Sequence, residues 1–247
     1  MTKRSAATSV ALSIFGLLLA ACALPAQNPE VSNGPSPTTS AEPTPGPSVT
    51  SLEGQFEFET MDKYVEAVLP MIEQWMDTTW PQMPQPELVY VPAGESGPEG
   101  CLDSNGEQGS YTSRSYEYCP SDETVYVGQR TLWEFYSETG DAGPAVGLAH
   151  EFGHHIQQQL NLPEPQTAAQ SIQYENQADC LSGAWVKFTD EQGWLEVPDD
   201  IEDIELLFPL IGSAEGVDRD HGTTEEREAA FNDGFTGGVT ACAVRAG

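Results

Sequence analysis

The spacing of apolar residues along the chain predicts mostly helices. Between Met61 and Met76, apolar side chains recur every three or four residues, which is typical of a helix with one buried face. Four further segments show a helical pattern: Arg130–Glu138, Gly143–Leu160, Gln166–Phe188 and Asp199–Leu210. The residues from Thr223 to Glu226 fit a capping box, so a last helix is predicted to begin there and to run to Asn232.

Two short segments predict strands. Leu88–Val91 follows a proline-rich break, and Thr124–Val127 precedes the helical segments; both are rich in β-branched and aromatic residues. Few strands among many helices predict an α+β fold that is mostly helical, with a small sheet. Residues 52–247 show no internal repeat and have a length typical of one domain with one core.

The N-terminus carries the pattern of a lipoprotein signal. Lys3 and Arg4 precede an almost continuously apolar run, Val10–Ala20, which is followed by Ala21 and Cys22. We therefore expect residues 1–21 to be a signal peptide and Cys22 to be the lipidated first residue of the mature protein. The alternatives are an ordinary secretory signal cleaved nearby and a transmembrane anchor. The apolar run is shorter than the about 20 residues needed to span a bilayer.

Residues 22–51 combine the lipidated cysteine with a predicted tether. From Ala23 to Ser51 the chain consists largely of Pro, Ser, Thr, Gly and Asn, with almost no large apolar side chains to bury. Such a composition is typical of a disordered linker. The expected location is therefore extracytoplasmic, with the protein anchored to the bacterial cell membrane by its N-terminal lipid.

The chain is strongly acidic. Its formal net charge is -30, and removal of the signal with Lys3 and Arg4 would bring it near -32. This charge argues against nucleic acid and bare anionic lipid as partners. It is compatible with a soluble domain beside the envelope or with basic substrates, and the oligomeric state stays open.

Four cysteines follow Cys22: Cys101, Cys119, Cys180 and Cys242. An even number outside the cytoplasm predicts two disulfides, for which three pairings exist. We favour Cys101 with Cys119, which would close a loop poor in core-forming residues and contribute about 3 kcal/mol. Cys180 with Cys242 would then attach the C-terminal tail to a predicted helix. No pair has the C-x-x-C spacing of a zinc site.

The segment that carries chemistry is His150-Glu151-Phe152-Gly153-His154, which matches H-E-x-x-H. Imidazoles four residues apart lie about 40° apart around a helix, so both can reach one ion. Glu151 projects about 100° from His150 and is better placed to touch a water molecule as a general base. A chance match is disfavoured because three of the four histidines lie within residues 150–155. His155 points away from His154, so a packing role is expected for it.

A second segment downstream supplies carboxylates. Glu175 would complete a His-His-Glu ligand set with His150 and His154, leaving one position open for water. Asp179, one helical turn later, could accept the outer N–H of a ligating imidazole. The residues therefore predict one Zn²⁺ per chain.

At these residues the chain resembles a known family. Ala149–Gln157 and Glu175–Trp185 look like the two signature segments of the bacterial putative neutral zinc metallopeptidases, and Tyr118–Val127 and His221–Arg227 are similar to two further segments. The resemblance covers roughly Phe58 to Cys242. It implies a zincin-like fold in which an edge strand flanks the active-site helix and binds extended peptide. By this resemblance, Thr124–Val127 is that edge strand.

The resemblance also raises His221 to a candidate catalytic residue. In the absence of the resemblance, a solvated surface histidine is the default interpretation, because the preceding residues are acidic. As a catalytic residue it would donate a hydrogen bond to the oxyanion formed from the scissile carbonyl. Tyr126 is a second candidate for this donor.

The expected function is a membrane-anchored, extracytoplasmic zinc metallopeptidase that cleaves peptide or protein substrates. A zinc-activated water would attack the peptide bond, with Glu151 as general base. Two alternatives stay open. One is a zincin-fold lipoprotein with a binding or scaffolding role and little proteolytic activity; the other is a metal-dependent cell-wall amidase.

Overall fold

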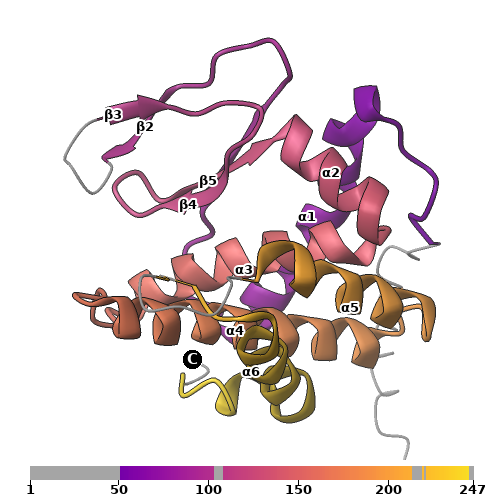
Figure 1. Cartoon of the computed structure of the whole chain (residues 1–247). Helices are drawn as coiled ribbons and strands as arrows, with labels where there is room; N and C mark the ends of the chain where they lie inside the picture. The colour runs from indigo at the N-terminus through magenta and orange to yellow at the C-terminus, as the bar shows by residue number, and fades with distance from the viewer. Residues whose placement is uncertain (1–50, 103–107, 213–218, 220, 245–247) are drawn as a thin grey trace, which may run out of the picture. The chain divides into compact units, whose positions relative to one another are not determined.

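The structure, a computed structural model, describes residues 51–102, 108–212, 219 and 221–244 (Figure 1). The predicted signal peptide, Cys22 and nearly all of the predicted tether lie outside these residues. In the described part of the chain, no helix combines the length and the apolar character needed to cross a membrane.

Helices dominate the described residues. They are α1 (Met61–Thr79), α2 (Gln129–Thr139), α3 (Ala142–Gln159), α4 (Ala168–Gln192), α5 (Asp199–Ile211) and α6 (Thr224–Gly237), with short 3-10 turns at Phe58–Thr60 and Gly238–Thr240. Every predicted helix is confirmed, with ends that differ by a few residues. The capping box of Thr223 and Glu226 is present, but α6 extends to Gly237 instead of ending at Asn232.

A three-stranded sheet lies beside α3 and meets it through β4 (Figure 1). Its order is β1 (Glu87–Val91), β5 (Thr124–Gly128) and β4 (Tyr116–Cys119), with β1 parallel and β4 antiparallel to β5. The predicted α+β class with a small sheet is therefore confirmed. A separate two-stranded sheet joins β2 (Glu99–Leu102) to β3 (Gln108–Ser110).

The prediction that Thr124–Val127 is the edge strand is wrong. These residues belong to β5, which lies in the centre of the sheet and is buried along its whole length. A strand covered on both faces needs apolar residues throughout, which explains its continuous apolar pattern. The edge strand beside α3 is β4, whose more polar sequence, Tyr-Glu-Tyr-Cys, did not predict a separate strand.

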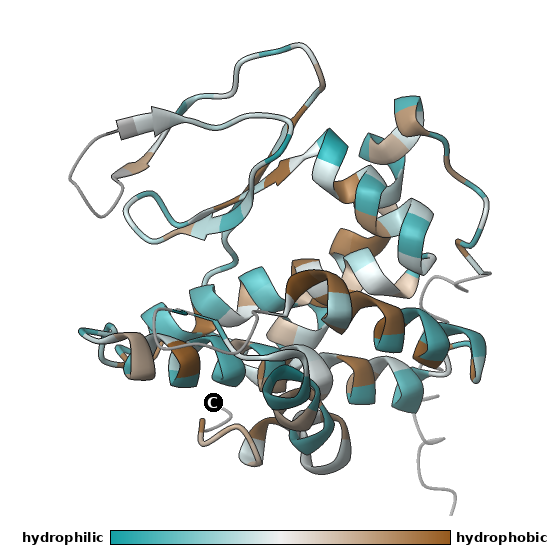
Figure 2. Ribbon diagram, viewed as in Figure 1, coloured by the Kyte–Doolittle hydropathy of each residue, from teal (hydrophilic) through white to brown (hydrophobic). Residues whose placement is uncertain are grey.

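Small residues allow the helices to approach one another closely. A Cβ added to Gly153 of α3 would lie 3.1 Å from the Cα of Ala178 in α4. In the same way, a Cβ on Gly234 of α6 would collide with the backbone oxygen of Cys180 in α4. Figure 2 shows hydrophobic and hydrophilic residues alternating along the helices, as expected when each helix buries one face.

Both predicted disulfides are confirmed. Cys101 pairs with Cys119, with their Cα atoms 5.6 Å apart, and so ties β2 to the end of the edge strand. Cys180 pairs with Cys242 at a Cα distance of 5.4 Å, which holds the segment after α6 against α4.

Candidate metal centre

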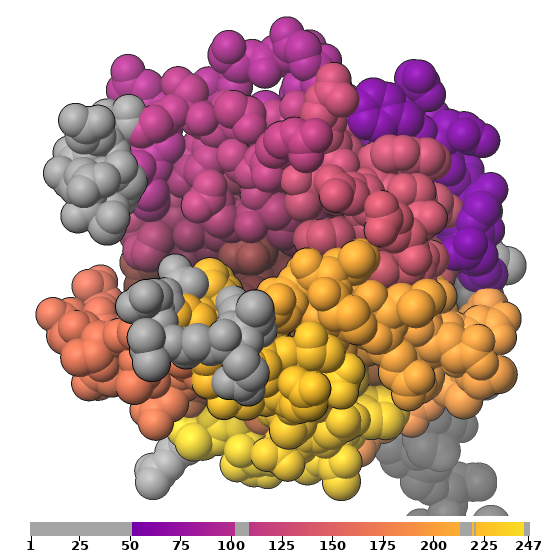
Figure 3. Space-filling view, viewed as in Figure 1, coloured from indigo at the N-terminus to yellow at the C-terminus, as the bar shows by residue number. Residues whose placement is uncertain are grey.

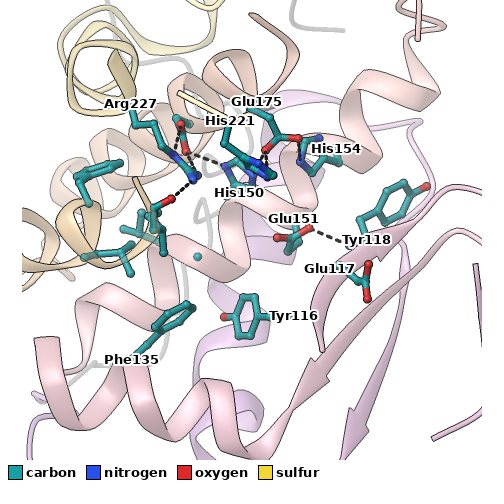
Figure 4. A pocket seen from close by; sticks show the side chains of 16 residues that line it. Tyr116, Glu117, Tyr118, Phe135, His150, Glu151, His154, Glu175, His221 and Arg227 are labelled. Carbon is teal, nitrogen blue, oxygen red and sulfur yellow. Dashed lines mark hydrogen bonds and ion pairs between the residues drawn. The ribbon is translucent and has the colours of Figure 1, made fainter. Parts of the chain in front are cut away.

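The three predicted metal ligands converge at the crossing of α3 and α4 (Figure 4). His150 Nε2 lies 3.3 Å from Glu175 Oε2, and His154 Nε2 lies 3.5 Å from Glu175 Oε1. One ligand atom from each of the three residues lies within 4.8 Å of the other two. Two imidazole nitrogens and one carboxylate are a donor set that fits Zn²⁺ and leaves a coordination position free.

The close approach at Gly153 positions these ligands. It lies between the two histidines on the face of α3 that meets Ala178. A larger residue at position 153 would therefore require α4 to shift at Ala178, three residues from Glu175.

Asp179 lies behind His150, as predicted. Its Oδ1 is 2.8 Å from His150 Nδ1, so it can accept the ring N–H and leave Nε2 directed at Glu175. The same carboxylate accepts two hydrogen bonds from Arg227, from Nε at 2.9 Å and from Nη2 at 2.8 Å. Arg227 Nη1 also donates to the carbonyl of Ile211 at 3.1 Å. Burial raises the pKa of Asp179, but His150 and Arg227 outweigh it and lower the pKa below its ordinary value.

Sequence reasoning missed two buried residues behind the ligands. Arg227 is only 5% exposed, and Gln157, whose Oε1 is 2.8 Å from His154 Nδ1, is fully buried. A signal for Arg227 existed, because a chain with only nine Lys and Arg residues places one of them in a segment that resembles the family. Gln157 also had a signal, because it ends the signature segment Ala149–Gln157, whereas the next two glutamines lie outside that segment.

Glu151 faces the same cavity from α3 and contacts the edge strand. Its Oε2 accepts a hydrogen bond from the backbone N–H of Tyr118 at 2.8 Å. Burial raises the pKa of Glu151, although the nearby His150 and His154 oppose this effect. A buried carboxylate with a raised pKa is a stronger base than an exposed one, which suits proton transfer.

His221 lies at the rim of the cavity. Its Nε2 is 3.6 Å from Glu175 Oε2, and its side chain is 45% exposed. The structure thus brings His221 to the predicted site, while its role as a hydrogen-bond donor stays a prediction.

Tyr126 and His155 are close to the metal centre in the sequence or the fold but do not belong to it. The suggestion of Tyr126 as an oxyanion donor is wrong, because this residue does not line the cavity: its hydroxyl donates to Asp122 Oδ2 at 2.7 Å, and its ring stacks on Tyr111. His155 is fully buried, with Nδ1 3.0 Å from the Tyr118 hydroxyl and Nε2 2.8 Å from the Pro84 carbonyl. Both ring nitrogens are therefore engaged, which confirms a packing role.

The cavity in front of these residues has a volume of about 520 Å³. In Figure 3 it opens between the surface of β4 and α2 and the surface of α5 and α6, with α3 deeper inside. One wall is apolar and was not predicted. Its side chains come from α2, α3 and α5: Phe135, Val146, Leu207, Phe208 and Ile211.

Nearby carboxylates raise the pKa of both histidines in the metal-free site. Burial lowers the pKa of His150, but Asp179 and Glu175 outweigh it and raise that pKa to about 10. Burial also lowers the pKa of His154, and Glu175 more than compensates, so this pKa is raised as well. The two histidines in turn hold the pKa of Glu175 well below its ordinary value, although burial alone would raise it.

Zinc binding is expected to release protons near pH 7. Because an imidazole must lose a proton to become a ligand, and because pH 7 lies below the raised pKa of His150, zinc has to displace that proton. The apparent affinity should therefore rise with pH, about tenfold per pH unit for each proton released. Calorimetric zinc titrations in buffers of different protonation enthalpy measure the number of protons released per zinc ion bound. A binding heat that is the same in all buffers would contradict the expectation.

Comparison with known proteins confirms the resemblance. Residues 49–244 match the family described as "Putative neutral zinc metallopeptidase". "Uncharacterized protein YpfJ" of Escherichia coli (strain K12) is 32% identical over 156 residues, which are 49% of this chain and 50% of that protein. "Uncharacterized protein Mb2605" of Mycobacterium bovis is 30% identical over 215 residues, covering 73% of this chain and 71% of that protein.

The chain thus spans about half the length of the Escherichia coli relative that it matches. No solved structure matches the chain.

Proposed function

The chain belongs to the family described as putative neutral zinc metallopeptidases, and from this membership we propose that it is a zinc-dependent peptidase. His150, His154 and Glu175 hold one zinc ion per chain. The observation that carries the proposal is the convergence of these three ligands with a buried carboxylate, Glu151, on one cavity. A site with a purely structural zinc normally has a fourth protein ligand and no use for a base.

The reaction is hydrolysis of a peptide bond. A bound zinc ion would polarise the scissile carbonyl and make water more acidic. Glu151 accepts the proton of the attacking water and then delivers it to the leaving amine. Asp179 and Gln157 keep the two imidazoles oriented throughout. His221 donates a hydrogen bond to the developing oxyanion.

The substrate is an extended peptide that pairs with β4. In an antiparallel ladder, alternate residues of an edge strand turn their backbone groups outward. The bond from Tyr118 N–H to Glu151 shows that Tyr118 is such a residue, and Tyr116 shares its orientation two residues earlier. Both residues line the cavity, and the apolar wall beside them suits a large apolar side chain of the peptide. Together with the ligand-bearing helices α3 and α4, this edge strand supports a zincin-like fold.

The proposed location is extracytoplasmic, with Cys22 carrying the lipid anchor. Two disulfides support an oxidising compartment. The lipoprotein signal pattern of residues 1–21 supports the anchor.

The proposal is tested by metal content and peptide cleavage in parallel. The wild-type protein should contain about one zinc per chain by elemental analysis and should cleave members of a diverse peptide library. His154→Ala should lose both properties, because two remaining ligands bind zinc poorly. Zinc without cleavage of any peptide would favour the binding role, and degradation of purified wall material instead of peptides would favour the amidase.

A further inference from the structure

A fully buried amide lies directly behind the second histidine ligand. Gln157 Oε1 is 2.8 Å from His154 Nδ1. Its Nε2 donates to the backbone carbonyl of Tyr174 at 2.8 Å and to Gln177 Oε1 at 3.0 Å. The oxygen and both amide hydrogens of Gln157 therefore have partners.

Gln177 continues this chain of hydrogen bonds toward the C-terminal segment. Its Nε2 donates to the backbone carbonyl of Cys242 at 2.9 Å. Cys242 is held against α4 by its disulfide with Cys180. The chain of bonds thus runs from a fixed backbone carbonyl through two amides to a metal ligand.

The donor and the acceptor of each of these hydrogen bonds follow from the backbone carbonyls of Cys242 and Tyr174. A carbonyl oxygen can only accept, so Gln177 has to present its NH₂ group to Cys242 and its oxygen to Gln157. Gln157, facing that oxygen and the Tyr174 carbonyl, has to present its NH₂ group to both. Its own oxygen then faces His154, where it can only accept. His154 Nδ1 must therefore carry a hydrogen when this bond forms.

We propose that Gln157 and Gln177 are positioning residues that fix His154 in the form that binds metal, with the Cys242 carbonyl as their anchor. A hydrogen on Nδ1 leaves the lone pair of the neutral ring on Nε2, the nitrogen that lies 3.5 Å from Glu175 Oε1. This inference rests on the metal site proposed above.

The two histidine ligands are thus supported in different ways. His150 faces a carboxylate, Asp179, both of whose oxygens can only accept when it is ionised. His154 faces an amide, which could present either its oxygen or its NH₂ group. Only Gln177 and the two backbone carbonyls decide that orientation, so the support of His154 depends on Gln177 and Cys242, which are not hydrogen-bonded to it, and on Tyr174, whose ring stacks on the His154 ring.

The test compares Gln157→Met and Gln177→Met with the wild-type protein. Methionine is close in size and removes the hydrogen bonds. The zinc dissociation constant, measured by chelator competition, should rise about ten- to a hundredfold in Gln157→Met and by a smaller factor in Gln177→Met. Gln159→Met is the matched control, because Gln159 lies on the same helix but lines a separate pocket beside Trp80; its zinc affinity should match that of the wild type.

A second readout reports on His154 itself. In the protein loaded with Co²⁺, ring N–H protons of ligating histidines give shifted NMR signals that exchange with water. The wild-type protein should show two such signals, and the one from His154 should be lost or exchange faster in both Gln157→Met and Gln177→Met, with the His150 signal unchanged. A role in stability alone would not affect one histidine selectively. Because Gln177 does not touch His154, its variant tests the inference even if Gln157→Met fails to fold.

The outcomes separate the inference from the proposed function. If the wild-type protein binds neither Zn²⁺ nor Co²⁺, both are overturned. If it binds metal tightly and the folded variants keep the wild-type affinity and His154 signal, the positioning role alone is overturned.

Discussion

Glu151→Gln is expected to abolish most peptide hydrolysis while zinc stays bound. Glutamine has almost the same shape, and its amide oxygen can still accept the hydrogen bond from Tyr118 N–H that Glu151 accepts at 2.8 Å. It cannot accept a proton from water, and general base catalysis contributes about 10²- to 10⁴-fold to rates. We therefore expect kcat to fall by about that factor, with one zinc per chain by elemental analysis. A peptide that the wild-type protein cleaves provides the assay.

Glu117→Gln is the matched control for this prediction. It removes the same charge from a carboxylate on β4 that lines the same cavity but is not one of the three predicted ligands. Its kcat should change by less than about tenfold, since it takes no part in proton transfer. Equal cleavage by Glu151→Gln and the wild-type protein would refute the role of Glu151 as general base.

Arg227→Met is expected to cause the largest loss of stability. Arg227 is 5% exposed and donates twice to the buried Asp179 and once to the Ile211 carbonyl. Removing one partner of a buried ion pair leaves the other charge poorly compensated, which costs about 3–5 kcal/mol. The free energy of unfolding in urea, measured for the zinc-free protein, should fall by this amount. Zinc affinity should fall as well, because Asp179 orients His150.

Two comparisons test the reason for that loss. Lys187→Met removes a surface ion pair with Glu191, at 2.6 Å and four residues away on α4, and should cost only about 0.3–0.5 kcal/mol. Adding Asp179→Asn to Arg227→Met should restore part of the lost stability, because it removes a buried charge that has lost its two hydrogen bonds from Arg227. A loss below about 1 kcal/mol in Arg227→Met would show that the pair does not hold α6 to α4.

The helices and metal ligands could be predicted because their signals are local. His150 and His154 are four residues apart, and helical geometry alone places both on one face. The capping box at Thr223 is likewise contained in four residues. The strands were harder, because β4 has no apolar pattern of its own and depends on pairing with β5.

The sequence by itself predicted the helical segments, the His-His-Glu set, the candidate base Glu151 and a preferred pairing of the four cysteines, which the structure contains. Only the tertiary structure decided that β4 instead of β5 forms the edge beside the site. It also decided that α5 contributes to the apolar wall, that Gln157 lies against His154 and that Arg227 binds Asp179 behind His150. Arg227 and Asp179 are 48 residues apart. Such a contact depends on how α6 packs against α4, and no periodicity within either helix encodes that packing.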